Sequence, residues 1–310
     1  MHFPTARPLT ERILIENFLK FALQDERFRD YDLIGKICSC ELELANYGND
    51  APTIDFEKNR HYDYRADAVR WQLRRKIVDE LFTMKMPKHE AEIRLGNGGA
   101  LPDCELQKKR KAFILIGPPA SGKSGVASTI ANNWGAVILD SDIAKRKIPE
   151  FKSNFAGATL VHNESSAIIW GETKWGIDFT PLVKKCTDEG INVVIPKIGD
   201  DFISIENLAK TLQNNLNYEV HLTLISLDRS LATKRALDRF IDNERYVPLG
   251  LIFDVYGNEP ILSYYRLKDR RGDHIKSFGK LSADVKQGSP LKVIYQEAGN
   301  PAELFNHKKL

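Results

Sequence analysis

One stretch of the sequence, FILIGPPASGKSGVAS at residues 113–128, constrains the fold more than any other. An apolar run ends at a glycine, two prolines follow, and Gly122-Lys123-Ser124 begins a segment of helical character. Residues 117–124 fit the pattern G-x-x-x-x-G-K-[ST]. We therefore expect a strand, a phosphate-binding loop and a helix, in that order.

The pattern gives the loop a chemical task. Glycines let the backbone curl so that several N–H groups point at phosphate oxygens, and the helix N-terminus adds partial positive charge. Lys123 is expected to reach the β- and γ-phosphates of a triphosphate, and the Ser124 hydroxyl to ligate Mg²⁺. ATP and Mg²⁺ are therefore the predicted cofactors. The residues predicted to bind ATP are Gly117, Pro118, Pro119, Ala120, Ser121, Gly122, Lys123, Ser124 and Gly125, together with Arg239 from a later segment.

Two aspartates follow the next apolar run. Residues 136–140 read AVILD, and Ser141 and Asp142 come directly after them. In open α/β sheets, ligands bind at the carboxyl ends of the strands. Asp142 there could accept the proton of an attacking hydroxyl, hold Mg²⁺ through water, or cap the next helix. We predict Asp142 as the catalytic base and Asp140, with Ser124, as a metal ligand.

The pattern of apolar residues predicts an α/β fold. Short β-rich runs at 112–116, 136–140, 191–196, 219–227 and 292–296 alternate with segments of helical character. Such alternation predicts a central parallel sheet with helices on both faces. Together with the phosphate-binding loop and the aspartates that follow it, this sheet leads us to expect the fold of a P-loop kinase with a central parallel sheet flanked by helices. Residues 1–105 differ, because they contain helical patterns and no strand-like run. We therefore predict a small all-α domain at 1–105 and a kinase domain at 106–310.

Helical spacing also predicts which faces of the N-terminal helices are buried. Two apolar stripes stand out, Ile13, Leu14, Phe18, Phe21 and Ala22 in one segment and Val69, Leu73, Ile77 and Leu81 in another. The basic clusters at 74–76 and 108–110 are expected to be solvated.

Composition limits the class of protein. The chain has 310 residues and a formal net charge of +3, which gives no reason to expect a nucleic-acid partner. The N-terminus lacks a long apolar run, so neither a signal peptide nor a membrane span is predicted. The four cysteines have no metal-binding spacing, and isolated thiols suit a reducing compartment. A cytoplasmic location is expected.

A basic segment lies further along the chain. Residues 226–250 read SLDRSLATKRALDRFIDNERYVPLG and carry Arg235, Arg239 and Arg245. Arginines above a phosphate site can bind the transferring phosphoryl oxygens, and small phosphotransferases carry such arginines on a mobile lid. The segment could also be an ordinary amphipathic surface helix. We predict a lid in which Arg235 and Arg245 act in catalysis.

Taken together, these segments resemble the zeta toxins, bacterial P-loop kinases usually neutralised by a small helical antitoxin. The resemblance covers about residues 110–250 and is carried, in order, by GPPASGKSG, VILDSDIAKRKIPEF, LVHNESS, GINVVIPKIGD and the arginine-bearing lid. It implies that Asp142 is the base, that Lys123 and Ser124 hold Mg-ATP, and that Arg235 and Arg245 are the lid arginines. The implied reaction is phosphorylation of the 3′-hydroxyl of UDP-N-acetylglucosamine by the toxin of a toxin–antitoxin system.

The acceptor side departs from the family pattern. The family strand usually ends in an acidic residue followed by Gly-Thr, whereas this chain has Pro196-Lys197-Ile198, and residues 170–180 resemble an insertion. His162, Glu164 and Lys197 are the predicted substrate contacts. The acceptor therefore stays open between a nucleotide-sugar and a dinucleotide, since related effectors phosphorylate the 3′-hydroxyl of the adenosine ribose of NAD. Two further classes of protein stay open as well, a polynucleotide kinase and an ATP-driven switch.

The N-terminal region also resembles a part of some zeta toxins. Some zeta toxins, of the EzeT type, carry the inhibitor fused ahead of the kinase on the same chain. The layout is similar to that arrangement, which implies that residues 1–105 act as an intramolecular antitoxin and hinder nucleotide binding. The same residues could instead be a structural extension that completes the kinase core.

Overall fold

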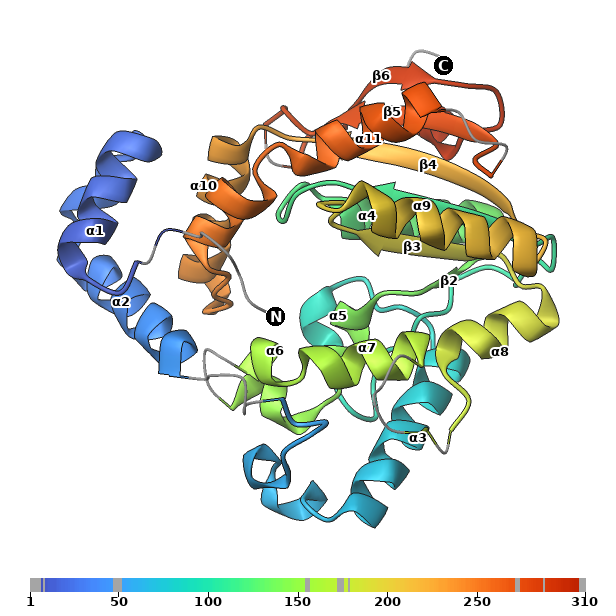
Figure 1. The fold of residues 1–310 in the computed structure, drawn as a ribbon, viewed down its shortest axis with the longest axis horizontal. Helices are drawn as coiled ribbons and strands as arrows, with labels where there is room; N and C mark the ends of the chain where they lie inside the picture. Colours follow the sequence, from blue (N-terminus) through green and yellow to red (C-terminus); the bar gives the residue numbers. More distant parts are fainter. Residues whose placement is uncertain are drawn as a thin grey trace. The chain divides into compact units, whose positions relative to one another are not determined.

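The structure is a computed structural model of the chain, and it describes residues 7, 9–46, 52–153, 157–171, 176–177, 179–270, 274–286 and 288–306. Part of the predicted insertion at 170–180, namely residues 172–175 and 178, lies outside this part of the chain. Figure 1 shows the fold of the chain.

Six strands form one sheet in the order β2-β3-β1-β4-β5-β6. They are β1 (Lys111–Ile116), β2 (Val137–Ile138), β3 (Val193–Lys197), β4 (Glu219–Ser226), β5 (Ser277–Ser282) and β6 (Lys292–Gln296). The pairs β2–β3 and β4–β5 are parallel, with Val137 opposite Val193 and His221 opposite Ser277. The predicted α/β class is confirmed. Two details differ, since β5 was not predicted and β6 runs antiparallel to it.

The chain forms two compact units, each described by itself. Unit 1 comprises residues 1–45, 112–126 and 196–310, and unit 2 comprises residues 46–111 and 127–195. Unit 1 contains the helices α1 (Arg12–Asn17), α2 (Tyr31–Asn46, except its last residue), α9 (Phe202–Lys210), α10 (Arg229–Asn243) and α11 (Glu259–Arg270). Helix α4 (Lys123–Trp134) begins in unit 1. Unit 2 contains α3 (Asp67–Thr83), α5 (Ser141–Lys145), α6 (Gly157–Leu160), α7 (His162–Trp170) and α8 (Leu182–Glu189). These units do not follow the boundary at residue 105, which stays a prediction about the organisation of the sequence.

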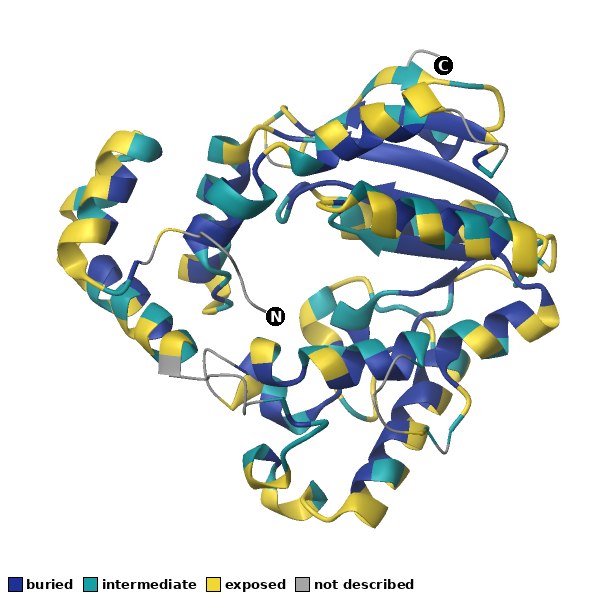
Figure 2. Ribbon diagram, viewed as in Figure 1, coloured by how far each residue is buried: buried dark blue, intermediate teal, exposed yellow. Residues whose placement is uncertain are grey.

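In unit 1, the first helices share a hydrophobic core with the end of α10. Figure 2 shows buried positions on these helices. The core contains Leu9, Ile15, Phe18, Leu19, Leu23, Leu33, Ile34, Ile37, Cys40, Leu237, Phe240, Tyr246, Leu249 and Phe253. Burial of this many apolar side chains is the main force that holds the N-terminal helices in unit 1.

The buried face of the first helix differs from the prediction. Phe18 is buried as expected, but Ile13 and Phe21 are 55% and 68% exposed, and the neighbouring positions Ile15 and Leu19 are buried instead. After α1 the chain continues as the π-helical turn η1 (Phe18–Ala22). A π-turn adds a residue to the turn, so the phase of a 3.6-residue pattern is lost.

In unit 2, helix α3 contributes both the predicted stripe and unpredicted charges to the interior. Leu73, Ile77 and Leu81 are buried, whereas Val69 is 38% exposed. The expectation that residues 74–76 form a solvated cluster is wrong for Arg74, which is buried on the same helix together with Arg70. Within the described residues, no helix combines the length and apolar character that crossing a membrane requires. The four cysteines are free thiols.

Candidate active site

The loop after β1 has the backbone that the phosphate-binding pattern predicts. It links β1 to α4, and both Ala120 (φ 59°) and Gly122 (φ 84°) adopt left-handed conformations. A Cβ on Gly117 would lie 2.4 Å from the carbonyl oxygen of Ile225, so only glycine fits there. A Cβ on Gly122 or Gly125 would meet nothing within 4 Å, so the space above these residues is open. A turn whose successive backbone N–H groups point into one concavity forms an anion-binding nest, and left-handed residues are a usual part of such a turn.

Lys123 lies at the first position of α4 and bends back over its own loop. Its Nζ donates hydrogen bonds to the carbonyl oxygens of Gly117 (2.7 Å) and Pro118 (2.6 Å) and lies 3.4 Å from Ser121 Oγ. The ammonium group is therefore held at the rim of the loop by acceptors that a phosphate can replace. Ser124, the predicted Mg²⁺ ligand, is exposed.

The end of β3 lies beside this loop within unit 1. The Gly117 amide donates to the carbonyl of Ile198 at 3.0 Å, and a Cβ on Gly199 would approach Ile116 to 2.7 Å. Lys197 is the last residue of β3 and is half-buried. The predicted substrate contact Lys197 thus lies one residue from a backbone contact with the phosphate loop.

The predicted lid arginines lie on α10 and just after it, also in unit 1. Arg235 Nη2 donates to the carbonyl of Val285 at 2.6 Å. Arg239 is half-buried near the end of α10. Arg245 follows the helix, and its amide donates to Asn243 Oδ1 at 3.1 Å. Asp228 begins α10 by accepting from the amides of Ser230 and Leu231, which sets where the helix starts.

In unit 2, the two aspartates after β2 have separate roles. Asp140 is the N-cap of α5 and accepts a hydrogen bond from the Asp142 amide at 2.9 Å. Asp142 has a side chain 43% exposed, and its Oδ1 lies 2.9 Å from Lys145 Nζ. The capping role that the sequence left open for Asp142 is therefore filled by Asp140. This leaves Asp142 in the first turn of the helix with solvent-accessible carboxylate surface.

Charge at this pair favours a cation. Burial raises the pKa of Asp140, and the negative charge of Asp142 raises it further. A divalent cation beside the pair would reverse that effect by favouring both carboxylates in their charged forms. Hydroxyl and carboxylate oxygens, as in Ser124 and Asp140, are the ligands Mg²⁺ prefers. These residue types fit the metal implied by the loop, and substrate phosphates usually complete such a shell. In the described part of the chain, no group of three or more His, Cys, Asp or Glu residues is arranged so that it could hold a metal ion by itself.

The predicted acceptor contacts on α7 have different surroundings. His162, the first residue of α7, is half-buried. Glu164 is completely buried, and its two carboxylate oxygens accept hydrogen bonds from Arg70, Arg74 and Thr53 at 2.5–2.7 Å. In this structure Glu164 does not line an open pocket, because every oxygen of its carboxylate is bound inside unit 2. Glu164 therefore has no exposed atom that could make the predicted contact with substrate.

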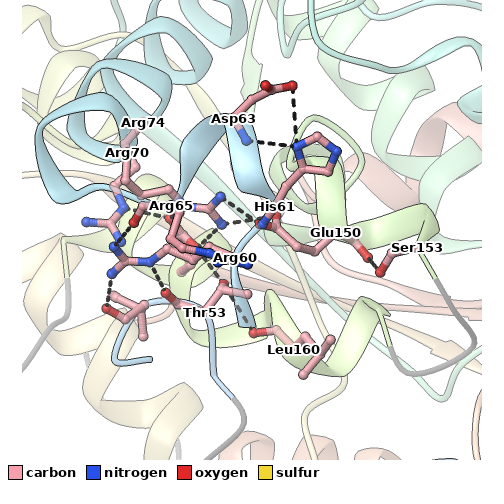
Figure 3. Close-up of polar contacts among 12 residues, drawn as sticks. Thr53, Arg60, His61, Asp63, Arg65, Arg70, Arg74, Glu150, Ser153 and Leu160 are labelled. Carbon is pink, nitrogen blue, oxygen red and sulfur yellow. Dashed lines mark hydrogen bonds and ion pairs between the residues drawn. The ribbon is translucent and has the colours of Figure 1, made fainter. Parts of the chain in front are cut away.

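The sequence patterns did not predict the buried charge network that surrounds Glu164. Arg70 bridges two carboxylates, with Nη1 2.9 Å from Glu150 Oε1 and Nη2 2.6 Å from Glu164 Oε2. Figure 3 shows Arg70, Arg74, Thr53 and Glu150 converging at this point. Arg60 adds a bond from its Nε to the carbonyl of Thr53 at 2.7 Å. One signal in the sequence could have indicated that these arginines are buried, because Arg70 and Arg74 lie on the same face of α3 as the apolar residues Leu73 and Ile77.

Comparison with known proteins places the chain beside one family. The family model for Zeta toxin matches residues 99–258. This range includes the phosphate loop, both aspartates and the predicted lid arginines. No curated protein matches the chain.

Solved structures share the fold at low sequence identity. A chain from the PezAT chromosomal toxin–antitoxin system of Streptococcus pneumoniae aligns with a TM-score of 0.52 and 15% identity, covering 77% of this chain and 87% of that one. The AvrRxo1-ORF1:AvrRxo1-ORF2 complex with ATP aligns at 0.42 and 16%, covering 80% and 73%. A gluconokinase from Sinorhizobium meliloti aligns at 0.34 and 13%, covering 58% and 86%. Only the first of these scores carries weight for the fold.

Proposed function

Because the chain belongs to the zeta toxin family, we propose that it is a Mg²⁺-dependent kinase that transfers the γ-phosphate of ATP to a sugar hydroxyl of a nucleotide-sugar or dinucleotide. Family membership makes the chain a phosphotransferase of the toxin-kinase type. The observation that carries the finer proposal is the loop at 117–124, with its two left-handed residues and Lys123 at the start of α4.

Each side chain has a part in this reaction. Asp142 accepts the proton of the acceptor hydroxyl as the oxygen attacks the γ-phosphorus and the bond to ADP breaks. Lys123, Arg235 and Arg245 stabilise the negative charge that spreads over the transferring group. Arg239 and the loop amides hold the remaining phosphates. Ser124 and Asp140 would hold Mg²⁺, which would supply positive charge to neutralise the phosphates.

The proposed acceptor is UDP-N-acetylglucosamine, phosphorylated at its 3′-hydroxyl, with His162 and Lys197 contacting it. Lys197 supports an anionic acceptor, because a cation stands at the strand end beside the phosphate loop. The test is incubation of the full chain with γ-labelled ATP and a panel containing UDP-N-acetylglucosamine, NAD and a 5′-hydroxyl oligonucleotide, read by mass spectrometry. A labelled oligonucleotide alone would replace this proposal with a polynucleotide kinase. Rapid ATP hydrolysis without acceptor would replace it with an ATPase switch.

The role of Asp142 gives a prediction of its own. Asp142→Asn keeps the size of the side chain but removes the basic carboxylate, so we expect turnover to fall about 10²–10⁴-fold while Mg-ATP affinity stays within about twofold. Steady-state kinetics and calorimetry measure the two effects. A matched control is Asp188→Asn, which removes an exposed carboxylate that pairs with Lys184 on α8. Loss of nucleotide affinity in Asp142→Asn would instead assign Asp142 to the metal site.

The N-terminal region is proposed to restrain the kinase in place of a separate antitoxin, in the cytoplasm. The similar PezAT chain comes from a toxin–antitoxin system. This origin supports an antitoxin-type partner for the present chain. The two parts of the region differ in what they contact. Residues 52–83 supply Arg70 and Arg74 to buried carboxylates in unit 2, which supports a structural role for them. Residues 9–45 pack against α10 and are the part to which we assign the restraint.

This division changes how restraint is best tested. Deleting residues 1–105 would leave Glu150 and Glu164 buried without their arginines, and such uncompensated charges are strongly destabilising. We expect that deletion to yield poorly folded protein, measured by circular dichroism and thermal unfolding. A well-folded and stable truncated chain would contradict the structural role of residues 52–83. Restraint is therefore best tested with point variants of the full chain.

A further inference from the structure

Helix α10 and the segment that follows it carry the arginines proposed to close over the phosphates. A lid of this kind acts by moving, on a timescale of microseconds to milliseconds. Elements that move for function usually have few buried apolar contacts and low local stability. The end of α10 and the residues after it have, in contrast, many buried apolar contacts.

The end of α10 and the residues after it are packed into the core of the N-terminal helices. Leu237 and Leu249 are completely buried, and Phe240, Tyr246 and Phe253 are 3–7% exposed. Their apolar partners in this core come from α1, η1 and α2. Phe18 meets Phe253 edge to face, with ring centroids 5.5 Å apart. Movement of the lid away from this position would expose that apolar surface.

Polar contacts fix the same interface at three places. Arg7 binds Asp254 through two hydrogen bonds of 2.8 and 2.9 Å. Arg27 Nη1 lies 2.5 Å from Asp238 Oδ1 on α10. The hydroxyl of Tyr246 donates a hydrogen bond to the Glu41 carboxylate on α2. Burial raises the pKa of Tyr246 well above its ordinary value, so the hydroxyl keeps the proton that it donates.

The contact at Tyr246 bears directly on Arg245. Glu244 ends α10 in a left-handed conformation (φ 59°) and fixes the backbone before Arg245. Tyr246 fixes it afterwards, through Glu41 and through an edge-to-face contact with Phe240 at 5.0 Å. Arg245 therefore lies between two anchored residues, one of which is held by the N-terminal helix α2.

We propose that helices α1 and α2 restrain the lid, holding Arg245 through the buried Tyr246–Glu41 hydrogen bond and the shared core, so that the free chain turns over ATP slowly. The inference rests on the proposed lid role of Arg245 and names the contact by which residues 9–45 regulate that site. Restraint acts on the movement of the lid, and it requires no side chain of the N-terminal helices to enter the phosphate loop.

The test begins with Tyr246→Phe, which removes only the hydroxyl and keeps the ring against Phe240. We expect hydrogen exchange of amides 240–257 to increase and Mg-ATP turnover of the full chain to rise about tenfold, the change typical of losing one hydrogen bond to a charged group. The matched control is Tyr295→Phe on β6, which removes a tyrosine–glutamate bond of 2.8 Å to Glu297. It should leave exchange at 240–257 and turnover unchanged.

Two further variants separate the outcomes. Glu41→Gln retains an acceptor oxygen for Tyr246 but removes its charge, so turnover should rise by less than in Tyr246→Phe. In an Arg245→Ala background, Tyr246→Phe should have no further effect on turnover, because the restraint acts through that arginine. Faster exchange without faster turnover, slower turnover, or additive effects in the double variant would overturn the proposal. Unchanged ATP turnover in Lys123→Ala would instead defeat the proposed kinase itself.

Discussion

Replacing Lys123 by alanine is expected to reduce phosphate transfer by about 10²–10³-fold, the loss typical of removing one charge-stabilising donor from a transition state. The ammonium group now spans the carbonyl oxygens of Gly117 and Pro118 at 2.7 and 2.6 Å. It is therefore held against the loop itself, and on ATP binding we expect the phosphates to replace those acceptors. Steady-state transfer from γ-labelled ATP measures the effect.

The fold should survive this change, because these hydrogen bonds of Lys123 lie within its own loop. We expect the free energy of unfolding of Lys123→Ala to stay within about 1 kcal/mol of the wild type, as measured by denaturant titration. Lys184→Ala is the control, since Lys184 is 61% exposed and pairs with Asp188 one turn away. A fully active Lys123→Ala enzyme would remove the basis for assigning the loop to ATP.

The phosphate loop was predictable because all of its determinants are local. The apolar residues of β1, the small residues of the turn and Lys123 all lie within residues 111–124, and the backbone conformation follows from that stretch. The same holds for Asp140, whose position directly after β2 makes it the cap of α5. Sequence patterns identify such segments because no distant contact is needed to form them.

Strand β5 was missed for the opposite reason. Its sequence, SFGKLS, contains a glycine and a lysine and lacks an apolar run. It becomes a strand because β4 pairs with it from His221–Ser277 to Ser226–Ser282. A Cβ at Gly279 would lie 2.1 Å from Asn300 Oδ1, so the glycine is required by the packing of a segment that follows β6. Tertiary context of this kind overrides local propensity.

The substrate side of the site was the least predictable part. Glu164 was predicted to contact substrate from its place in a short motif, and that motif contains no information about its partners. Those partners, Arg70 and Arg74, are 94 and 90 residues away in the chain. Arg74 had been expected in a solvated cluster, because a run of basic residues is usually exposed. Only the folded unit shows that both arginines point inward.

The largest expected loss of stability follows from this network. Arg70→Ala would remove the cation that the buried carboxylates of Glu150 and Glu164 share inside unit 2. Removal of one partner of a buried ion pair typically costs about 3–5 kcal/mol, so we expect a loss of that size in the free energy of unfolding, measured by denaturant titration. The matched control is Lys108→Ala, which breaks an exposed pair with Glu189 in the same unit (60% and 47% exposed). Exposed pairs contribute about 0–1 kcal/mol.

The dependence of stability on acidic pH should depend on the same network. Burial alone would raise the pKa of Glu164, but the hydrogen bonds and positive charges of Arg70 and Arg74 outweigh it and lower the pKa from 4.5 to about 2. A carboxylate with a lower pKa in the folded state than in the unfolded state adds stability above the unfolded pKa, and that stability is lost as the pH falls. The wild type should therefore lose stability between about pH 4.5 and pH 2, and Glu164→Gln should lose less over the same range. Parallel pH profiles for the two proteins would show that Glu164 is not the charge on which the network depends.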